Sequence, residues 1–213
     1  LHPRVRRQRQ MCIRDSYETR VREGATVAGK ALFVCANRYI AYDFYKIVTE
    51  LRPEWAEKKI CSDDVILDDK DKKELKPMEK IKLVMTRNKD DEKDLFDMLG
   101  TKDDRKEFDR QFKNPKSNFK IAIVVDMWLT GFDVPELDTI YIDKPIQQHT
   151  LIQTISRVNR VCEGKDKGLI VDYIGIKKNM NTALKKYTNF ESEEFEGVEQ
   201  CVTIVKDQLE VPG

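Results

Sequence analysis

The sequence lacks the features that mark metal, disulfide and membrane proteins. It has only two histidines, His2 and His149, and its five cysteines are scattered without a C-x-x-C pair. This argues against a zinc site or a disulfide framework and favours a reduced, cytoplasmic protein. No apolar run approaches the roughly 20 residues that a membrane-spanning helix needs. The arginine-rich beginning of the sequence has no continuous apolar segment of the kind found in secretory signals.

An excess of charge of one sign is also missing. Lys+Arg number 39 and Asp+Glu 38, so any contact with nucleic acid must come from local placement rather than from bulk attraction. The composition is 40% hydrophobic and 36% charged, which suits a protein with a buried core and a hydrated surface. A length of 213 residues allows one α/β domain of ordinary size with short additions.

A working phosphate loop is absent as well, although GATVAGKA (residues 24–31) comes close to the pattern G-x-x-x-x-G-K-[ST]. Ala31 stands where the hydroxyl that binds Mg²⁺ should be. Such a loop follows a strand and opens a helix, whereas here polar sequence precedes the glycines and an apolar run follows them. We therefore predict a glycine-containing entry to the first strand and no ATP at this loop.

Residues 1–29 differ in composition from the rest of the chain. Half of the arginines precede Glu23, whereas the first lysine is Lys30. The segment could be a basic arm that binds phosphates. It could also be a disordered leader, or sequence foreign to the natural protein, since RQRQMCIRDS resembles translated adapter sequence. We predict a leader without function, disordered or non-native, and exclude it from the fold.

From Lys30 onward, short apolar runs alternate with segments of helical periodicity. This alternation predicts an α/β domain over residues 30–188, in which a parallel sheet is covered by helices on both faces. The charged residues 54–80 read as a loop or insertion, and residues 189–213 as the truncated start of a following segment. The expected strands are 31–36, 81–86, 121–126, 139–143 and 168–173; the expected helices are 38–51, 91–99, 102–112, about 147–160 and about 177–187.

Two stretches carry candidate chemistry. VVDMWLTGFDVP (residues 124–135) is a buried strand that ends in a loop with Thr130, Gly131 and Asp133. At the carboxyl end of a parallel strand such a loop can meet a ligand. QTISRVNR (residues 153–160) places Gln153, Arg157 and Arg160 on one helix face, as a planar donor array for phosphate oxygens. Alone, the first stretch could be a tight turn with a capping Asp, and the second a solvated basic face.

Together, the two stretches resemble motifs V and VI of superfamily-two helicases and translocases, in which two RecA-like lobes clamp ATP. The resemblance narrows to the second motor lobe of the R subunit of type I restriction endonucleases. It covers about residues 30–188 and is most specific in the phrases MWLTGFDVP, YIDKP and SRVNRV. It implies a three-layer RecA-like fold and a chain that is a fragment of a longer protein.

The resemblance implies roles for the residues of both stretches. Arg160 would be the arginine finger, with Arg157 beside it near the γ-phosphate. Gln153 would position the nucleotide or couple it to lobe closure. Asp133 would contact the ribose or the motif VI helix, and Gly131 would allow close backbone approach.

DNA contacts are implied at the carboxyl ends of the first two predicted strands and at the motif V loop. The residues expected there are Asn37, Arg38, Thr86, Arg87 and Thr130. Contacts of this kind to phosphates carry no sequence information. For Arg38 and Arg87, an exposed arginine at a helix start is an equally good interpretation.

The implied function is ATP-driven translocation and cleavage of double-stranded DNA in the prokaryotic cytoplasm, with no membrane contact. ATP and Mg²⁺ would be bound mainly by the first RecA-like lobe of the same parent chain, which also carries the nuclease domain. Modification and specificity subunits would complete the complex, and the isolated fragment would be inactive. The alternatives are a lobe of another superfamily-two DNA or RNA helicase, and a catalytically silent RecA-like module that binds nucleic acid. The intact arginine pair argues against the silent module.

Overall fold

The computed structural model describes residues 3–62, 65–129, 131–146, 148–158, 160, 165, 168–174 and 203–206. For residues 3–12, 148 and 203–206 it describes the backbone alone. The helix expected at about 177–187 lies outside the described residues.

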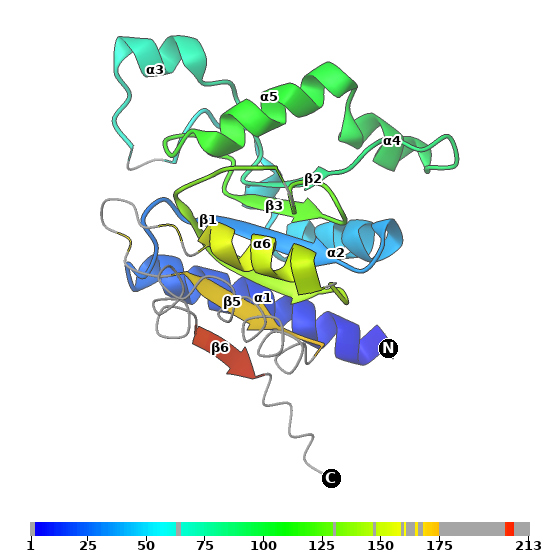
Figure 1. Cartoon of the computed structure of the whole chain (residues 1–213). Helices are drawn as coiled ribbons and strands as arrows, with labels where there is room; N and C mark the ends of the chain where they lie inside the picture. The colour runs from blue at the N-terminus through cyan, green and yellow to red at the C-terminus, as the bar shows by residue number, and fades with distance from the viewer. Residues whose placement is uncertain are drawn as a thin grey trace.

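A parallel sheet forms the middle layer of the protein (Figure 1). Within the described residues it has six strands in the order β2-β3-β1-β4-β5-β6, and every neighbouring pair is parallel. The apolar runs predicted as strands are buried along their whole length in β1, β2, β3 and β5, as expected for a sheet covered on both faces. The strands are β1 Lys30–Cys35, β2 Ile81–Val84, β3 Ile121–Val124, β4 Leu137–Asp143, β5 Leu169–Asp172 and β6 Thr203–Lys206.

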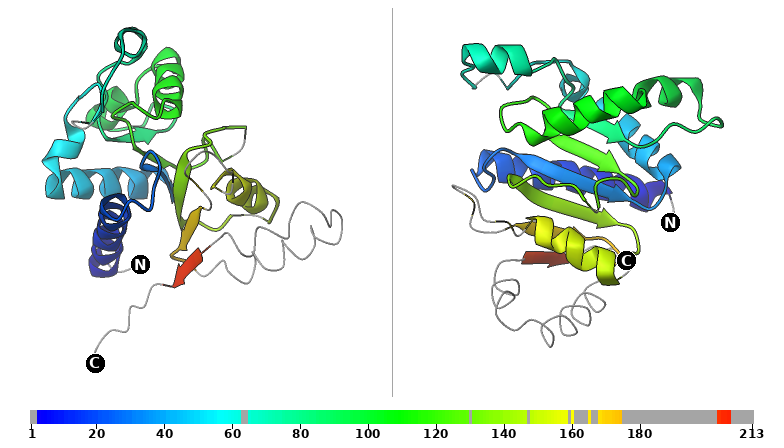
Figure 2. Two further views of the ribbon diagram at one scale, coloured as in Figure 1. Left: turned by 90° about the vertical axis from the view of Figure 1, so that its left-hand side faces the viewer. Right: turned by 45° about the horizontal axis from the view of Figure 1, so that its top comes forward.

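Alternate residues of the strands face two separate hydrophobic clusters. In β1, Phe33 packs with residues of one cluster, which includes helices α1, α2 and α4, and its neighbour Leu32 packs with the other, which includes α5 and α6. Figure 2 shows α1 and α2 on one side of the sheet and α6 on the other. The predicted three-layer α/β architecture is confirmed. The helices are α1 Pro3–Arg22, α2 Arg38–Leu51, α4 Lys93–Leu99, α5 Lys102–Lys113 and α6 Gln148–Val158.

Local capping explains where the predicted helices begin. Asn37 ends the β1–α2 turn, and its Oδ1 accepts a hydrogen bond from Ile40 N at 3.0 Å. Thr101 and Asp104 form a capping box at the start of α5. Pro53 follows the last residues of α2 and starts a 3₁₀ helix, Pro53–Ala56. The boundaries of α2 are those predicted from the periodicity of its apolar residues.

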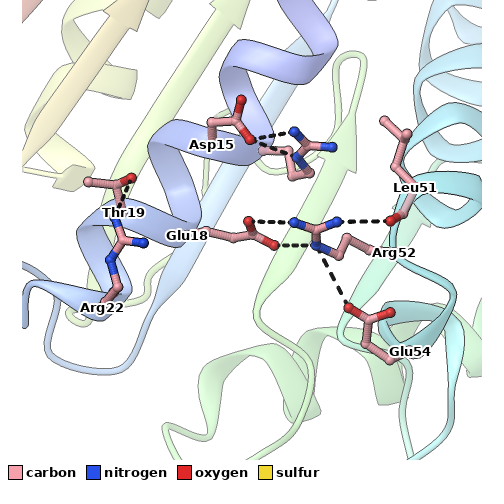
Figure 3. Close-up of polar contacts among 8 residues, drawn as sticks. Asp15, Glu18, Thr19, Arg22, Leu51, Arg52 and Glu54 are labelled. Carbon is pink, nitrogen blue, oxygen red and sulfur yellow. Dashed lines mark hydrogen bonds and ion pairs between the residues drawn. The ribbon is translucent and has the colours of Figure 1, made fainter.

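Residues 1–29 are predicted to be a disordered or non-native leader, and the expectation of disorder is wrong for residues 3–22. Residues 3–22 form helix α1, whose Ile13 and Tyr17 are buried in the core. Tyr17 stacks edge-on against Trp55 at 5.6 Å and donates a hydrogen bond to Gly29 O at 2.9 Å. Arg52, just after α2, pairs with Glu18 through two hydrogen bonds of 2.6 and 3.0 Å (Figure 3). Two apolar residues, a helical turn apart, attach α1 to the core, and they are hard to recognise in a sequence so rich in arginine.

Two further boundaries differ from the predictions. Residues 54–80 are largely irregular, as expected, yet they include the short helix α3, Asp69–Glu74, and an antiparallel bridge between Lys59 and Met78. Trp55, Leu75 and Met78 are buried and hold this segment to the domain. The tail, expected to start a following segment, supplies β6, which extends the same sheet beside β5. In the part of the chain that the structure describes, no helix is long and apolar enough to cross a membrane.

The packing of α1 makes a prediction about stability. Tyr17→Ala should lower the free energy of unfolding by about 3–5 kcal/mol, because it removes a buried ring and its hydrogen bond. Val21→Ala is the control in the same helix, since Val21 is 41% exposed, and should change stability by less than about 0.5 kcal/mol. Urea unfolding of the purified chain measures both. Equal, small effects would show that α1 is detached from the core.

Candidate functional site

The structure brings the predicted arginines together with the predicted loop. Arg157, on α6, donates through Nε to Leu129 O at 3.1 Å. Arg160 Nη1 forms an ion pair with Asp133 Oδ2 at 2.5 Å. Leu129 and Asp133 both belong to the connection between β3 and β4, at the carboxyl end of β3. The motif V-like and motif VI-like stretches therefore form one site.

The two guanidinium groups also influence each other. Burial lowers the pKa of Arg157, the nearby positive charge of Arg160 lowers it further, and the carboxylate of Asp133 raises it. The Arg160 and Asp133 side chains are 52% and 54% exposed, so water screens their ion pair. Two neighbouring cations beside one carboxylate, Asp133, suit an anion that takes hydrogen bonds from planar donors.

The backbone of the loop is fixed by an unusual conformation. Gly131 has φ +69°, and a Cβ placed there would meet nothing within 4 Å, so the space beside the glycine is open. Trp128 also has a positive φ, 67°, which costs a residue with a side chain about 1–2 kcal/mol. Its ring stacks on Phe132 at 4.1 Å with an interplanar angle of 3°, and also lies 5.2 Å from Phe112 of α5. The aromatic stack offsets the strain and sets the path of the loop.

One residue predicted for this site, Gln153, stands apart from the arginine contacts. Gln153 lies four residues before Arg157 on α6, and its Nε2 is 3.1 Å from His149 Nε2, a hydrogen bond within the same helix. Thr130 lies outside the described residues.

Besides the arginine site, the structure has a cavity where the carboxyl ends of β2, β3 and β1 meet. Its volume is about 360 Å³, and it contains three of the residues predicted to contact DNA. Its lining residues are Ala36, Asn37, Arg38, Met85, Thr86, Val125, Asp126 and Met127. This cavity, which we call the strand-end cavity, has walls from β1 and β2, and its floor follows β3, which lies between them in the sheet.

The predicted DNA-contact residues that the structure describes have partners within the chain. Asn37 caps α2. Arg38 pairs with both carboxylate oxygens of Asp91 and donates to Thr86 O at 3.1 Å. Arg87 donates to Phe96 O at 2.8 Å and lies over the Phe96 ring at 4.4 Å. Arg38 and Arg87 are therefore tied into the fold rather than extended into solvent.

Sequence reasoning missed one charged residue of this region. Asp91, the partner of Arg38, is separated from it by 53 residues, and no local pattern connects the two. Lys144, at the end of β4, donates to Val125 O at 3.1 Å and pairs with Asp126, which offsets the acidic charge in the lining of the strand-end cavity.

The donor set of the arginine site fits phosphate better than metal. Arg157, Arg160 and the open backbone at Gly131 suit phosphate oxygens. Among the described residues there is no group of three or more His, Cys, Asp or Glu side chains that could hold a metal ion.

Comparison with known proteins identifies the family. The family model described as "Type I restriction enzyme subunit R domain 3" matches residues 28–175. The chain belongs to this family. The type I R-subunit resemblance seen in the sequence is thus confirmed, and the match includes the strand-end cavity, the β3–β4 loop and both arginines.

Curated relatives agree with this family. The chain is 36% identical over 189 residues to the "Type I restriction enzyme HindI endonuclease subunit" of Haemophilus influenzae, covering 86% of this chain and 16% of the relative. It is 41% identical over 162 residues to the "Putative type I restriction enzyme MjaIXP endonuclease subunit" of Methanocaldococcus jannaschii, covering 76% of this chain and 13% of the relative. The chain thus spans about a sixth or less of the length of these R subunits.

Among solved structures, the chain matches that of S. cerevisiae Dbp5 L327V bound to Gle1 H337R and IP6, with a TM-score of 0.49 and 14% sequence identity. The similarity covers 91% of this chain and 38% of that chain. A similarity with so low a TM-score supports no conclusion about this chain.

The left-handed conformation of Gly131 leads to a prediction. Gly131→Ala should destabilise the protein by about 1 kcal/mol through backbone strain alone, because the space for a Cβ is open. Gly131→Asn should cost less, since asparagine tolerates this conformation better. Urea unfolding of both variants measures the difference. An alanine variant as stable as the parent would show that the loop does not hold this backbone conformation.

Proposed function

We propose that this chain is the second motor lobe of an ATP-dependent DNA translocase, the R subunit of a type I restriction enzyme. The observation that supports this most is the shared loop between β3 and β4. Its residues Val125, Asp126 and Met127 line the strand-end cavity, and its residues Leu129 and Asp133 hold the two arginines. One short segment therefore touches both the proposed DNA site and the proposed nucleotide site.

At the nucleotide side, Arg160 acts as the arginine finger and Arg157 binds beside it. ATP with Mg²⁺ supplies the phosphoryl group when it is bound, mainly by another lobe of the same parent chain. Phosphoryl transfer depends on positioning and on charge stabilisation, which a guanidinium provides through paired hydrogen bonds. Arg160 must first leave Asp133, and an exposed ion pair of this kind is worth only about 0–1 kcal/mol. The exchange therefore costs little, and Asp133 becomes free to accept from a ribose hydroxyl.

The strand-end cavity is the proposed contact with duplex DNA. Thr86 and Asn37 line opposite walls and offer polar groups to phosphate oxygens. Thr130 adds a contact from the loop, and Arg87 supports the wall that carries Thr86. Phosphate contacts position a protein on DNA without reading its bases, which leaves the choice of target to the specificity subunit of the complex.

In the assembled enzyme, hydrolysis at the lobe interface drives movement along DNA, and the nuclease domain of the parent chain cuts. Modification and specificity subunits complete the complex in the prokaryotic cytoplasm. The chain alone is proposed to be inactive, because the groups that bind Mg²⁺ and the β- and γ-phosphates belong to the first lobe. A silent scaffold would have no use for two arginines held beside an open glycine.

The arginine-finger role gives the main test. In the R subunit that contains this chain, Arg160→Ala should lower DNA-stimulated ATPase turnover by about 10³-fold or more and leave DNA binding unchanged. Arg110→Ala is the matched control, because Arg110 is also an exposed arginine in an ion pair, with Glu107 at 2.8 Å on α5. Steady-state ATPase assays with saturating duplex DNA measure the effect. If Arg160→Ala turned over ATP as fast as Arg110→Ala, another residue would be the finger.

The cavity gives a second test. Thr86→Ala should weaken binding of the complex to unrelated duplexes by about two- to tenfold, and to a similar extent for each, because one hydrogen bond to phosphate is lost. Thr49→Ala on α2 is the control, since Thr49 bonds to Tyr45 O and is not part of the cavity lining. Fluorescence anisotropy with several labelled duplexes measures the dissociation constants. Equal affinity of the two variants would remove the cavity from the DNA path.

A further inference from the structure

The strand-end cavity is bridged by an ion pair that ties its two walls together. Arg38 begins α2 directly after β1, and Asp91 lies in the connection between β2 and α4. In the sheet β1 and β2 are separated by β3, so the two residues reach across about two strand spacings, roughly 10 Å. We propose that Arg38 and Asp91 form a clamp that sets the width of the cavity, and that Arg38 is a positioning residue rather than a ligand of DNA phosphate. This inference rests on the proposed DNA-binding function of the cavity.

The hydrogen bonds of the clamp join three segments. Arg38 Nε donates to Asp91 Oδ1 at 2.9 Å, and Arg38 Nη2 lies 2.6 Å from Oδ1 and 2.5 Å from Oδ2. The same Nη2 is 3.1 Å from Thr86 O. Asp91 Oδ2 also accepts from Asn88 N at 2.7 Å. One carboxylate thus fixes the turn after β2, and one guanidinium fixes both that carboxylate and the backbone of Thr86.

The burial of the pair shows that it is part of the fold. The side chain of Asp91 is only 4% exposed, and that of Arg38 is 24% exposed. A buried carboxylate that loses its cation is left uncompensated, which strongly disfavours any state in which Arg38 leaves. A DNA phosphate would have to compete with this carboxylate for the guanidinium, so Arg38 offers little net attraction to DNA.

The clamp instead holds in place the two residues that can still contact DNA phosphates, Thr86 and Asn37. Thr86, on the wall from β2, is held through its carbonyl oxygen, so the backbone that carries its side chain keeps a set position. Asn37, on the opposite wall, precedes Arg38 and caps α2. Donors must lie at a fixed spacing to bind successive phosphate oxygens, and losing the clamp would let the two walls move apart. The clamp therefore affects DNA binding through Thr86 and Asn37.

The chain contains a closely similar ion pair to serve as a control. Arg52 pairs with Glu18 through Nε and Nη2 at 2.6 and 3.0 Å, with side chains that are 33% and 32% exposed (Figure 3). It joins α1 to the end of α2 and contributes nothing to the lining of the strand-end cavity. Arg52→Lys therefore reports the general cost of disrupting a paired arginine.

The experiment measures duplex DNA binding by the full R-subunit complex over a series of salt concentrations. Asp91→Ala, Arg38→Ala and Arg38→Lys should each weaken binding by about tenfold, and the double alanine variant should be no weaker than the single ones. Lysine keeps the charge at the cavity but cannot make the paired contact. The slope of log K against log salt should stay unchanged, because no phosphate contact by a cation is lost. Arg52→Lys should bind DNA like the parent.

Opposite results would overturn the clamp. If Arg38 binds phosphate directly, Asp91→Ala should strengthen binding or leave it unchanged, because it frees the guanidinium and removes a negative charge. In that case Arg38→Ala should also reduce the salt slope by about 1, and Arg38→Lys should retain most of the affinity. Thr86→Ala distinguishes a failure of the clamp from a failure of the proposed DNA-binding function of the cavity. If Thr86→Ala weakens DNA binding and Asp91→Ala does not, the clamp alone is refuted. If Thr86→Ala leaves DNA binding unchanged, the DNA-binding function of the cavity is refuted.

Discussion

The site depends on the contacts that Arg157 of α6, and Arg160 just beyond its end, make with the loop after β3. Arg157 bonds to the backbone at Leu129, and Arg160 pairs with Asp133. Without them the arginines would be two cations at the end of a surface helix, and the loop would be an ordinary connection. With them, two stretches that are separate in the sequence become one surface at the carboxyl edge of the sheet, where α/β proteins bind their ligands.

The hydrophobic core holds this surface in place. Trp128 keeps its left-handed backbone because its ring stacks on Phe132 and lies against Phe112 of α5. The loop is therefore anchored on one face of the sheet by α5, while its first residues, 125–127, line the strand-end cavity and its middle part contacts the arginines. The proposed link between DNA and nucleotide is short because one loop takes part in both sites. Backbone strain that is balanced by packing is frequent at such functional positions.

The sequence predicted the parts whose information is local. Buried strands read as continuous apolar runs, and the periodicity of the apolar residues correctly predicted α2 over residues 38–51. The resemblance to motifs V and VI implied that Asp133 contacts the ribose or the motif VI helix, and in the structure its carboxylate pairs with Arg160, just after α6. Tertiary partners could not be predicted in this way. The pairing of Arg38 with Asp91 joins segments 53 residues apart, and helix α1 is held by a few apolar residues within a run of arginines. Strand β6 is four residues long, too short for its alternation to stand out in the acidic tail.

The central claim is that the paired arginines face a nucleotide whose other binding groups belong to a different lobe. The most direct measurement is an experimental structure of the R subunit that contains this chain, bound to DNA and a non-hydrolysable ATP analogue. The account predicts that Arg160 has left Asp133 and that its guanidinium lies about 3 Å from γ-phosphate oxygens, with Arg157 beside it. An analogue bound elsewhere, with Arg160 still paired to Asp133, would contradict it.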